Sequence, residues 1–116
     1  MRIAVVEDCD TDFRLLKTAL TSYDVVRFKT LKEYTQFKKK LDMCIADLSL
    51  PDSWGVDTIK AVSKKGVPFV ILSGLASGYF PHKVIELVLK SGGLAMIDKR
   101  DTIGIEWDKL IKEVAV

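Results

Sequence analysis

Residues 1–20 read MRIAVVEDCDTDFRLLKTAL, and this opening stretch decides the fold. Its apolar run, Arg2–Val6, stops at two acidic residues, and an amphipathic segment follows in which apolar side chains such as Leu16 and Leu20 recur at helical spacing. We therefore expect a strand and then a helix with Thr11 as its N-cap. A strand that is apolar on both faces is typical of a parallel sheet covered by helices, so the stretch predicts the first unit of an α/β fold.

The same alternation of short apolar runs and amphipathic segments continues to the end of the chain. The expected strands are Arg2–Val6, Val25–Phe28, Met43–Ala46, Phe69–Leu72 and Leu94–Ile97. The expected helices are the segment after Thr11, Leu31–Lys40, Val56–Lys65 with Gly66 as its C-cap, Lys83–Lys90 and Ile105–Val114. This pattern predicts an α/β fold, a doubly wound five-stranded parallel sheet with helices on both faces, in one domain that spans residues 1–116.

The composition limits the functional classes. The chain has 116 residues, 48% of them hydrophobic, and its 18 basic and 16 acidic residues leave a net charge of only +2. That balance gives no reason to expect binding to nucleic acid or to an anionic membrane. Two cysteines are too few for a disulfide framework, and the first apolar run is too short for a signal peptide or a membrane span. We expect a soluble cytoplasmic protein.

Polar side chains stand where the predicted strands end. Glu7 and Asp8 follow the first strand, Asp47 the third, Ser73 the fourth and Lys99 the fifth. Because the carboxyl ends of parallel strands meet at one edge, these side chains are expected to converge there. Three carboxylates would repel one another, whereas a hard divalent ion such as Mg²⁺ would hold them ionised. A carboxylate beside such a metal, with a hydroxyl and an ammonium opposite, is suited to phosphoryl transfer, which predicts an aspartyl phosphate on Asp47.

Four separate segments resemble the receiver domain of two-component response regulators, of the chemotaxis-regulator type. They are IAVVEDCDTDFRLL, IADLSLPDSWGVDTIKAV, PFVILSG and AMIDK, and the resemblance extends over essentially the whole chain. It implies the flavodoxin-like receiver fold. It also implies that a sensor histidine kinase or a phosphotransfer protein phosphorylates the chain, which relays the signal to a downstream protein by a conformational change. The only catalysis implied is the chain's own phosphorylation and dephosphorylation.

The resemblance also implies a role for each residue at the predicted edge. Asp47 would be the phospho-acceptor, Ser73 would donate a hydrogen bond to a phosphoryl oxygen, and Lys99 would form an ion pair with the phosphoryl group. The implied magnesium ligands are Glu7, Asp8, Asp47 and the main-chain carbonyl of Ser49. Asp8 would be the direct ligand of the acidic pair.

Three features depart from the family pattern. Met96 stands where the family usually has a Tyr or Phe ring, and Arg100 stands where it typically has proline in a cis peptide. The segment GLASGYFPHK, residues 74–83, makes the stretch before Lys99 longer than usual. We therefore expect any phosphorylation signal to run through residues 74–83 and not through Met96. The departures also leave an alternative, a degenerate receiver that acts as a phosphorylation-independent protein-interaction module.

Other functions fit the same residues less well than a receiver does. A phosphatase of the haloacid dehalogenase kind needs a second Asp two residues after its nucleophile, and that position is Ser49. Nucleotide binding is disfavoured because neither glycine-rich phosphate-binding motif occurs. Asp10 and Asp12 are assigned to the first turn of the first helix, outside the site. Trp54 either covers the helix that follows it or flanks the phosphorylation pocket.

Overall fold

The structure is a computed structural model that describes residues 1–74 and 82–114. The main strands are β1 (Arg2–Val6), β2 (Asp24–Phe28), β3 (Met43–Asp47), β6 (Phe69–Ser73) and β7 (Gly93–Asp98). The α-helices are α1 (Asp10–Ala19), α2 (Leu31–Gln36), α3 (Val56–Lys64), α4 (His82–Lys90) and α5 (Trp107–Val114). Two short strands, β4 (Ser49–Leu50) and β5 (Ser53–Trp54), form a separate antiparallel hairpin, and Lys99–Gly104 form a 3-10 helix.

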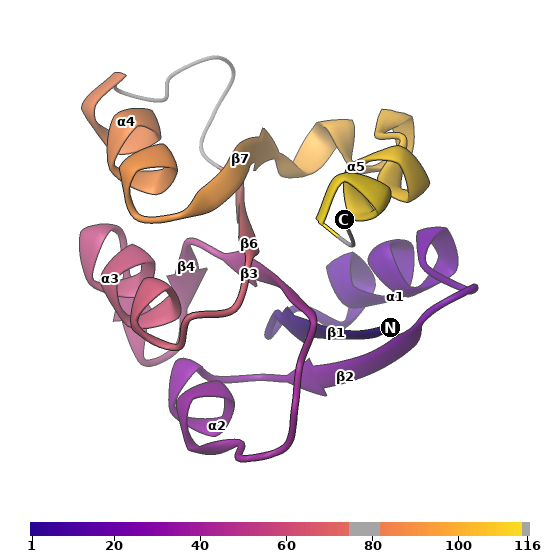
Figure 1. Cartoon of the computed structure of the whole chain (residues 1–116), viewed down its shortest axis with the longest axis horizontal. Coiled ribbons are helices and arrows are strands. Elements are labelled where there is room, and N and C mark those ends of the chain that lie inside the picture. The colour runs from indigo at the N-terminus through magenta and orange to yellow at the C-terminus, as the bar shows by residue number, and fades with distance from the viewer. Residues whose placement is uncertain (75–81, 115–116) are drawn as a thin grey trace.

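The main sheet has the strand order β2-β1-β3-β6-β7, and all of its pairings are parallel. Figure 1 shows α1 and α5 on one face of this sheet and α2, α3 and α4 on the other. The predicted doubly wound α/β fold is therefore confirmed. The chain changes direction across the sheet between β1 and β3, and such a switch point opens a crevice at the carboxyl ends of the strands.

Two apolar clusters, one on each face, hold the sheet between the helices. Successive residues of a strand point to opposite faces, so Met43 and Ile45 of β3 pack with α1 and α5 while Cys44 and Ala46 pack with α2, α3 and α4. All five residues of β3 are buried. This double coverage explains why the central strands are apolar without alternation, and it keeps the carboxyl edge of the sheet in place.

Three helix boundaries differ from the prediction by two residues or more. The last helix, α5, begins at Trp107 and not at Ile105, which follows the 3-10 helix. The N-cap of α1 is Cys9 and not Thr11, because the carbonyl of Cys9 already accepts a hydrogen bond from the amide of Phe13 at 3.0 Å. The predicted helix Leu31–Lys40 ends at Gln36. Phe37 leaves the helical conformation and packs edge-on against Phe28, with ring centroids 5.1 Å apart. The packing of this partly buried ring favours an end to the helix one turn earlier than predicted.

The long segment predicted before α4 is only partly described. Residues 75–81 of the stretch 74–83 lie outside the described residues, so its proposed part in signalling stays a prediction. None of the helices in residues 1–74 and 82–114 is both long enough and apolar enough to span a membrane.

Candidate active site

All of the residues predicted at the strand ends except Glu7 line one pocket at the carboxyl edge of the sheet. The pocket has a volume of about 390 Å³. Its lining residues are Asp8, Asp47, Leu48, Ser49, Trp54, Ser73, Gly74 and Lys99. Asp47 and Ser73 are the last residues of the neighbouring strands β3 and β6, which explains how residues far apart in the sequence come together. Glu7, directly after β1, lies beside this pocket and is buried.

The ammonium group of Lys99 is the centre of a network of carboxylates. Its Nζ lies 2.7 Å from Oδ2 of Asp47, 2.7 Å from Oε1 of Glu7 and 2.8 Å from Oδ2 of Asp12. Burial by itself lowers the pKa of Lys99, but hydrogen bonds to these three carboxylates outweigh it and raise the pKa above the ordinary value. The ammonium is therefore charged at every physiological pH.

Asp12 belongs to this network, so its assignment to the helix alone was wrong. It does lie in the first turn of α1, as predicted, but its carboxylate also contacts Lys99 from across the fold. The spacing along the chain gives no sign of this contact, because Asp12 and Lys99 are 87 residues apart. Only the packing of α1 beside the residues that follow β7 brings them together.

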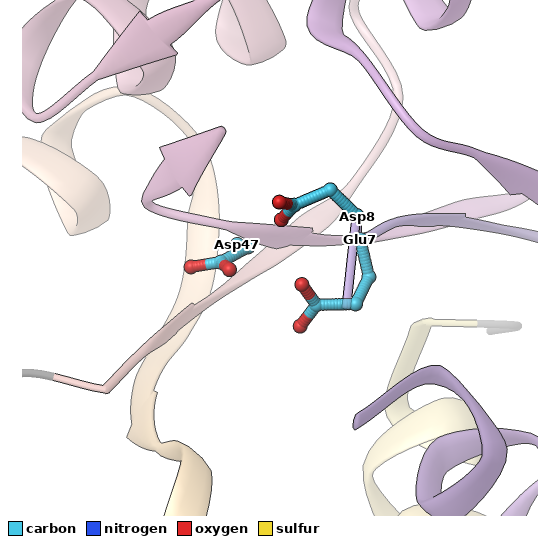
Figure 2. Close-up of side chains that lie close together, drawn as sticks. All are labelled: Glu7, Asp8 and Asp47. Carbon is cyan, nitrogen blue, oxygen red and sulfur yellow. The ribbon is translucent and has the colours of Figure 1, made fainter. Parts of the chain in front are cut away.

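The side chains of Glu7, Asp8 and Asp47 lie close together (Figure 2). Each of them offers an oxygen, and these oxygens lie within 4.8 Å of one another. Burial raises the pKa of Glu7 to about 7; Lys99 opposes this shift, and the charge of Asp47 adds to it. A crowded set of carboxylate oxygens is the ligand type that Mg²⁺ prefers, so the donor set fits this ion.

The segment after Asp47 is held by hydrogen bonds on both sides. The amide of Ser49 donates to Oδ1 of Asp47 at 3.1 Å, and the hydroxyl of Thr58 donates to the carbonyl of Leu48 at 3.1 Å. The carboxylate of Asp52, in the turn between β4 and β5, accepts the first two amides of α2 at 2.9 Å each. This hairpin was not predicted, because two-residue strands leave too short a pattern.

Trp54 lies at the rim of the pocket. It is part of β5, opposite Ser49 in the hairpin, and its side chain is 64% exposed. Of the two alternatives considered from the sequence, the structure favours the one in which this indole flanks the pocket.

Arg27 is a site residue that the sequence reasoning missed. From β2 its guanidinium donates to the main-chain carbonyl oxygens of Glu7 at 3.1 Å and Asp8 at 3.3 Å, and its Nη2 lies 2.7 Å from Oδ1 of Asp10. It thereby fixes the loop that carries the acidic pair. The signal that could have revealed it is a lone charged residue inside an apolar strand, VVRF.

Arg100 builds the turn that presents Lys99. Its backbone amide donates to Oδ1 of Asp98 at 2.9 Å, and Asp98 is the N-cap of the 3-10 helix. The hydroxyl of Thr102 donates to the carbonyl of Lys99 at 2.8 Å and closes the same turn. A proline at position 100 has no N–H and could not make the first of these bonds. Met96, the other departure, is partly buried against the cluster under α2, α3 and α4.

Neither a protein-family model nor a curated protein matches the chain, but solved structures do. The HemR receiver domain from Leptospira biflexa is 27% identical over 95% of this chain and 93% of its own, with a TM-score of 0.74. The receiver domain of the Francisella response regulator 1452 is 25% identical over 98% of this chain and 93% of its own, with a TM-score of 0.71. The response regulator domain of Thermotoga maritima CheB is 21% identical over 100% of this chain and 97% of its own, with a TM-score of 0.78.

These neighbours share the fold of the chain over nearly its whole length. Such a fold supports a function in two-component signalling. The resemblance predicted from the sequence is confirmed, and the chain has the fold of a response regulator receiver domain.

Proposed function

We propose that this chain is a two-component receiver that accepts a phosphoryl group on Asp47. The observation that carries the proposal is the environment of that carboxylate. Its Oδ2 lies 2.7 Å from Nζ of Lys99, and it shares a pocket with Asp8 and Ser73. A buried carboxylate that faces an open pocket, beside a fixed cation and a hydroxyl, is placed to act as a nucleophile toward phosphorus.

The proposed donor is the phosphohistidine of a sensor histidine kinase or of a phosphotransfer protein. A carboxylate oxygen of Asp47 attacks the phosphorus of the phosphohistidine, whose ring is protonated on its other nitrogen. The P–N bond breaks, its electron pair stays on the ring nitrogen, and the histidine leaves as neutral imidazole. Lys99 and the hydroxyl of Ser73 offset the charge on the transferred oxygens. Hydrolysis by water then releases inorganic phosphate and restores the carboxylate. The chain would act on no substrate other than its own phosphoryl group.

The acidic residues are proposed to hold Mg²⁺. The proposed ligands are Asp8, Asp47 and the main-chain carbonyl of Ser49, with Glu7 beside them. When bound, the ion supplies positive charge that offsets the charge of the transferring phosphoryl group. Burial is the main cause of the raised pKa of Glu7 and the charge of Asp47 is a further cause, and a bound cation would favour the ionised form of this carboxyl.

The output is proposed to be a conformational change that a downstream protein recognises. We place the chain in the cytoplasm, where its two free cysteines, Cys9 and Cys44, would stay reduced. No role in binding nucleic acid or membrane is proposed.

Intact-mass measurement after incubation with acetyl phosphate and Mg²⁺ tests the proposal. The wild-type chain should gain one phosphoryl group, and both Asp47→Asn and chelation of the metal should abolish the gain. Asp57→Asn, at an exposed position in α3, is the matched control and should leave the gain unchanged. Phosphorylation of Asp47→Asn at the wild-type rate would refute the assignment. A folded wild-type chain that gains no mass would favour the degenerate receiver.

A further inference from the structure

Lys99 lies between two cavities. One is the pocket of about 390 Å³ that contains Asp47 and Ser73. The other is a small cavity of about 10 Å³ whose lining includes Asp12, Leu16 and Thr102. Lys99 lines both cavities, whereas Asp12 is not among the described residues that line the larger one. The carboxylate of Asp12 therefore contacts the ammonium from the side that faces α1, away from the pocket.

Asp12 is firmly placed to make this contact. It is the third residue of α1, where the free amides of the first turn favour a negative charge. Its Oδ2 lies 2.8 Å from Nζ of Lys99, and only 35% of its side chain is exposed. The helix thus fixes the main chain of Asp12, and its carboxylate forms an ion pair with Lys99.

The contact has a consequence for any anion attached to Asp47. The oxygens of such an anion extend into the larger pocket, so Lys99 must turn toward that pocket to reach them. The carboxylate of Asp12, which lines the smaller cavity, attracts the ammonium and opposes this movement. Asp12 also adds negative charge close to the place where the anion binds.

We propose that Asp12 is a positioning residue that restrains Lys99 on the α1 side and so weakens the binding of a phosphoryl-like anion at Asp47. The inference rests on the proposed function of Asp47, although the restraint itself does not. Asp12 touches neither the donor nor the phosphoryl group, and it acts only through Lys99.

Binding of beryllofluoride in the presence of Mg²⁺, followed by the fluorescence of Trp54, tests the effect on the anion. Asp12→Asn should bind about fivefold more tightly than wild type, the size expected for one partly exposed ion pair. Asp57→Asn is the matched control, because it removes the same charge from the first turn of another helix, α3, at an exposed position. Asp12→Glu restores the carboxylate and should return the affinity to the wild-type value. Equal affinities of Asp12→Asn and Asp57→Asn would overturn the proposal.

Acylation of Lys99 in the metal-free protein tests the restraint directly, with labelled peptides quantified by mass spectrometry. Release from Asp12 should make Lys99 react several-fold faster in Asp12→Asn and no faster in Asp57→Asn. Unchanged labelling in Asp12→Asn would show that no restraint exists. Faster labelling together with wild-type beryllofluoride affinity would overturn the effect on the anion. Faster labelling in a chain that binds no beryllofluoride at all would refute the proposed function and leave the restraint standing.

Discussion

Arg100 binds the carboxylate of Asp98 through its main chain and its side chain together. The backbone amide donates to Oδ1 at 2.9 Å, and Nε donates to the same oxygen at 3.0 Å. Lys99, the cation of the site, is the residue between them. The residue that departs from the family pattern thus stabilises the turn from which the lysine extends.

This pair predicts a change in acid stability. Hydrogen bonds from Arg100 lower the pKa of Asp98 to about 2, below the value of 3.8 that is usual for Asp. Because the folded chain holds the ionised form more strongly, this stabilisation is present above about pH 4 and is lost as the pH falls toward 2. Arg100→Ala should therefore unfold at a higher pH than wild type in an acid titration followed by circular dichroism. Arg14→Ala, at an exposed position in α1, should unfold at the wild-type pH.

Glu7 should make the stability of the metal-free protein depend on pH in the opposite direction. Its pKa is raised from 4.5 to about 7 by burial and by Asp47, so the folded chain holds the proton more strongly than the unfolded chain. The free energy of unfolding should fall by about 2 kcal/mol as the pH rises from 5 to 8. Glu7→Gln should remove most of this slope in urea unfolding with a chelator present. Glu86→Gln, at an exposed position in α4, should keep it, and an unchanged slope in Glu7→Gln would contradict the prediction.

Lys99→Met should separate metal binding from the response to phosphorylation. The substitution leaves Glu7 and Asp47 buried without their cation, which should lower the stability of the metal-free protein by about 2–4 kcal/mol. Added Mg²⁺ should restore part of this loss, and its affinity should not fall, because the ammonium is not a ligand of the ion. The change in Trp54 fluorescence on binding beryllofluoride should be lost. Lys60→Met, exposed on α3, is the control. A loss of Mg²⁺ affinity together with a normal response would contradict the prediction.

Gly93, at the start of β7, occupies a position that has no room for a larger residue. A Cβ atom there would lie 2.5 Å from Cγ1 of Val88 and 2.9 Å from the ring of Phe69. Gly93→Ala should therefore lower the free energy of unfolding by about 2–3 kcal/mol, because the buried neighbours must move apart. Gly104→Ala would meet nothing within 4 Å and should change stability by less than about 0.5 kcal/mol. Chemical denaturation of the two variants checks the difference, and equal stabilities would show that the packing around Gly93 adjusts freely.

The sequence predicts the sheet and its functional edge well because both depend on patterns along a few consecutive residues. β3 is a run of apolar residues that ends at Asp47, and a parallel arrangement then brings that end next to Ser73. The fold class alone determines which strand ends meet, so the sequence is enough to predict that Asp47 and Ser73 are neighbours.

The details that the sequence does not predict depend on contacts between distant segments. The end of α2 is determined by the packing of Phe37 on Phe28, which a helical pattern over Leu31–Lys40 does not show. The contacts of Arg27 with the carbonyl oxygens of Glu7 and Asp8 depend on the register between β1 and β2. Positions of this kind are decided by tertiary structure and not by local propensity.

The hydrogen bonds from the first two amides of α2 to Asp52 tie together parts of the chain that look independent. With six residues, α2 is too short to persist in water by itself, so its first turn relies on a side chain supplied by the loop that follows Asp47. Fraying of this helix and loosening of that loop are consequently one cooperative event. Unfolding of α2 should therefore loosen the loop that follows Asp47, although α2 contributes no residue to the pocket.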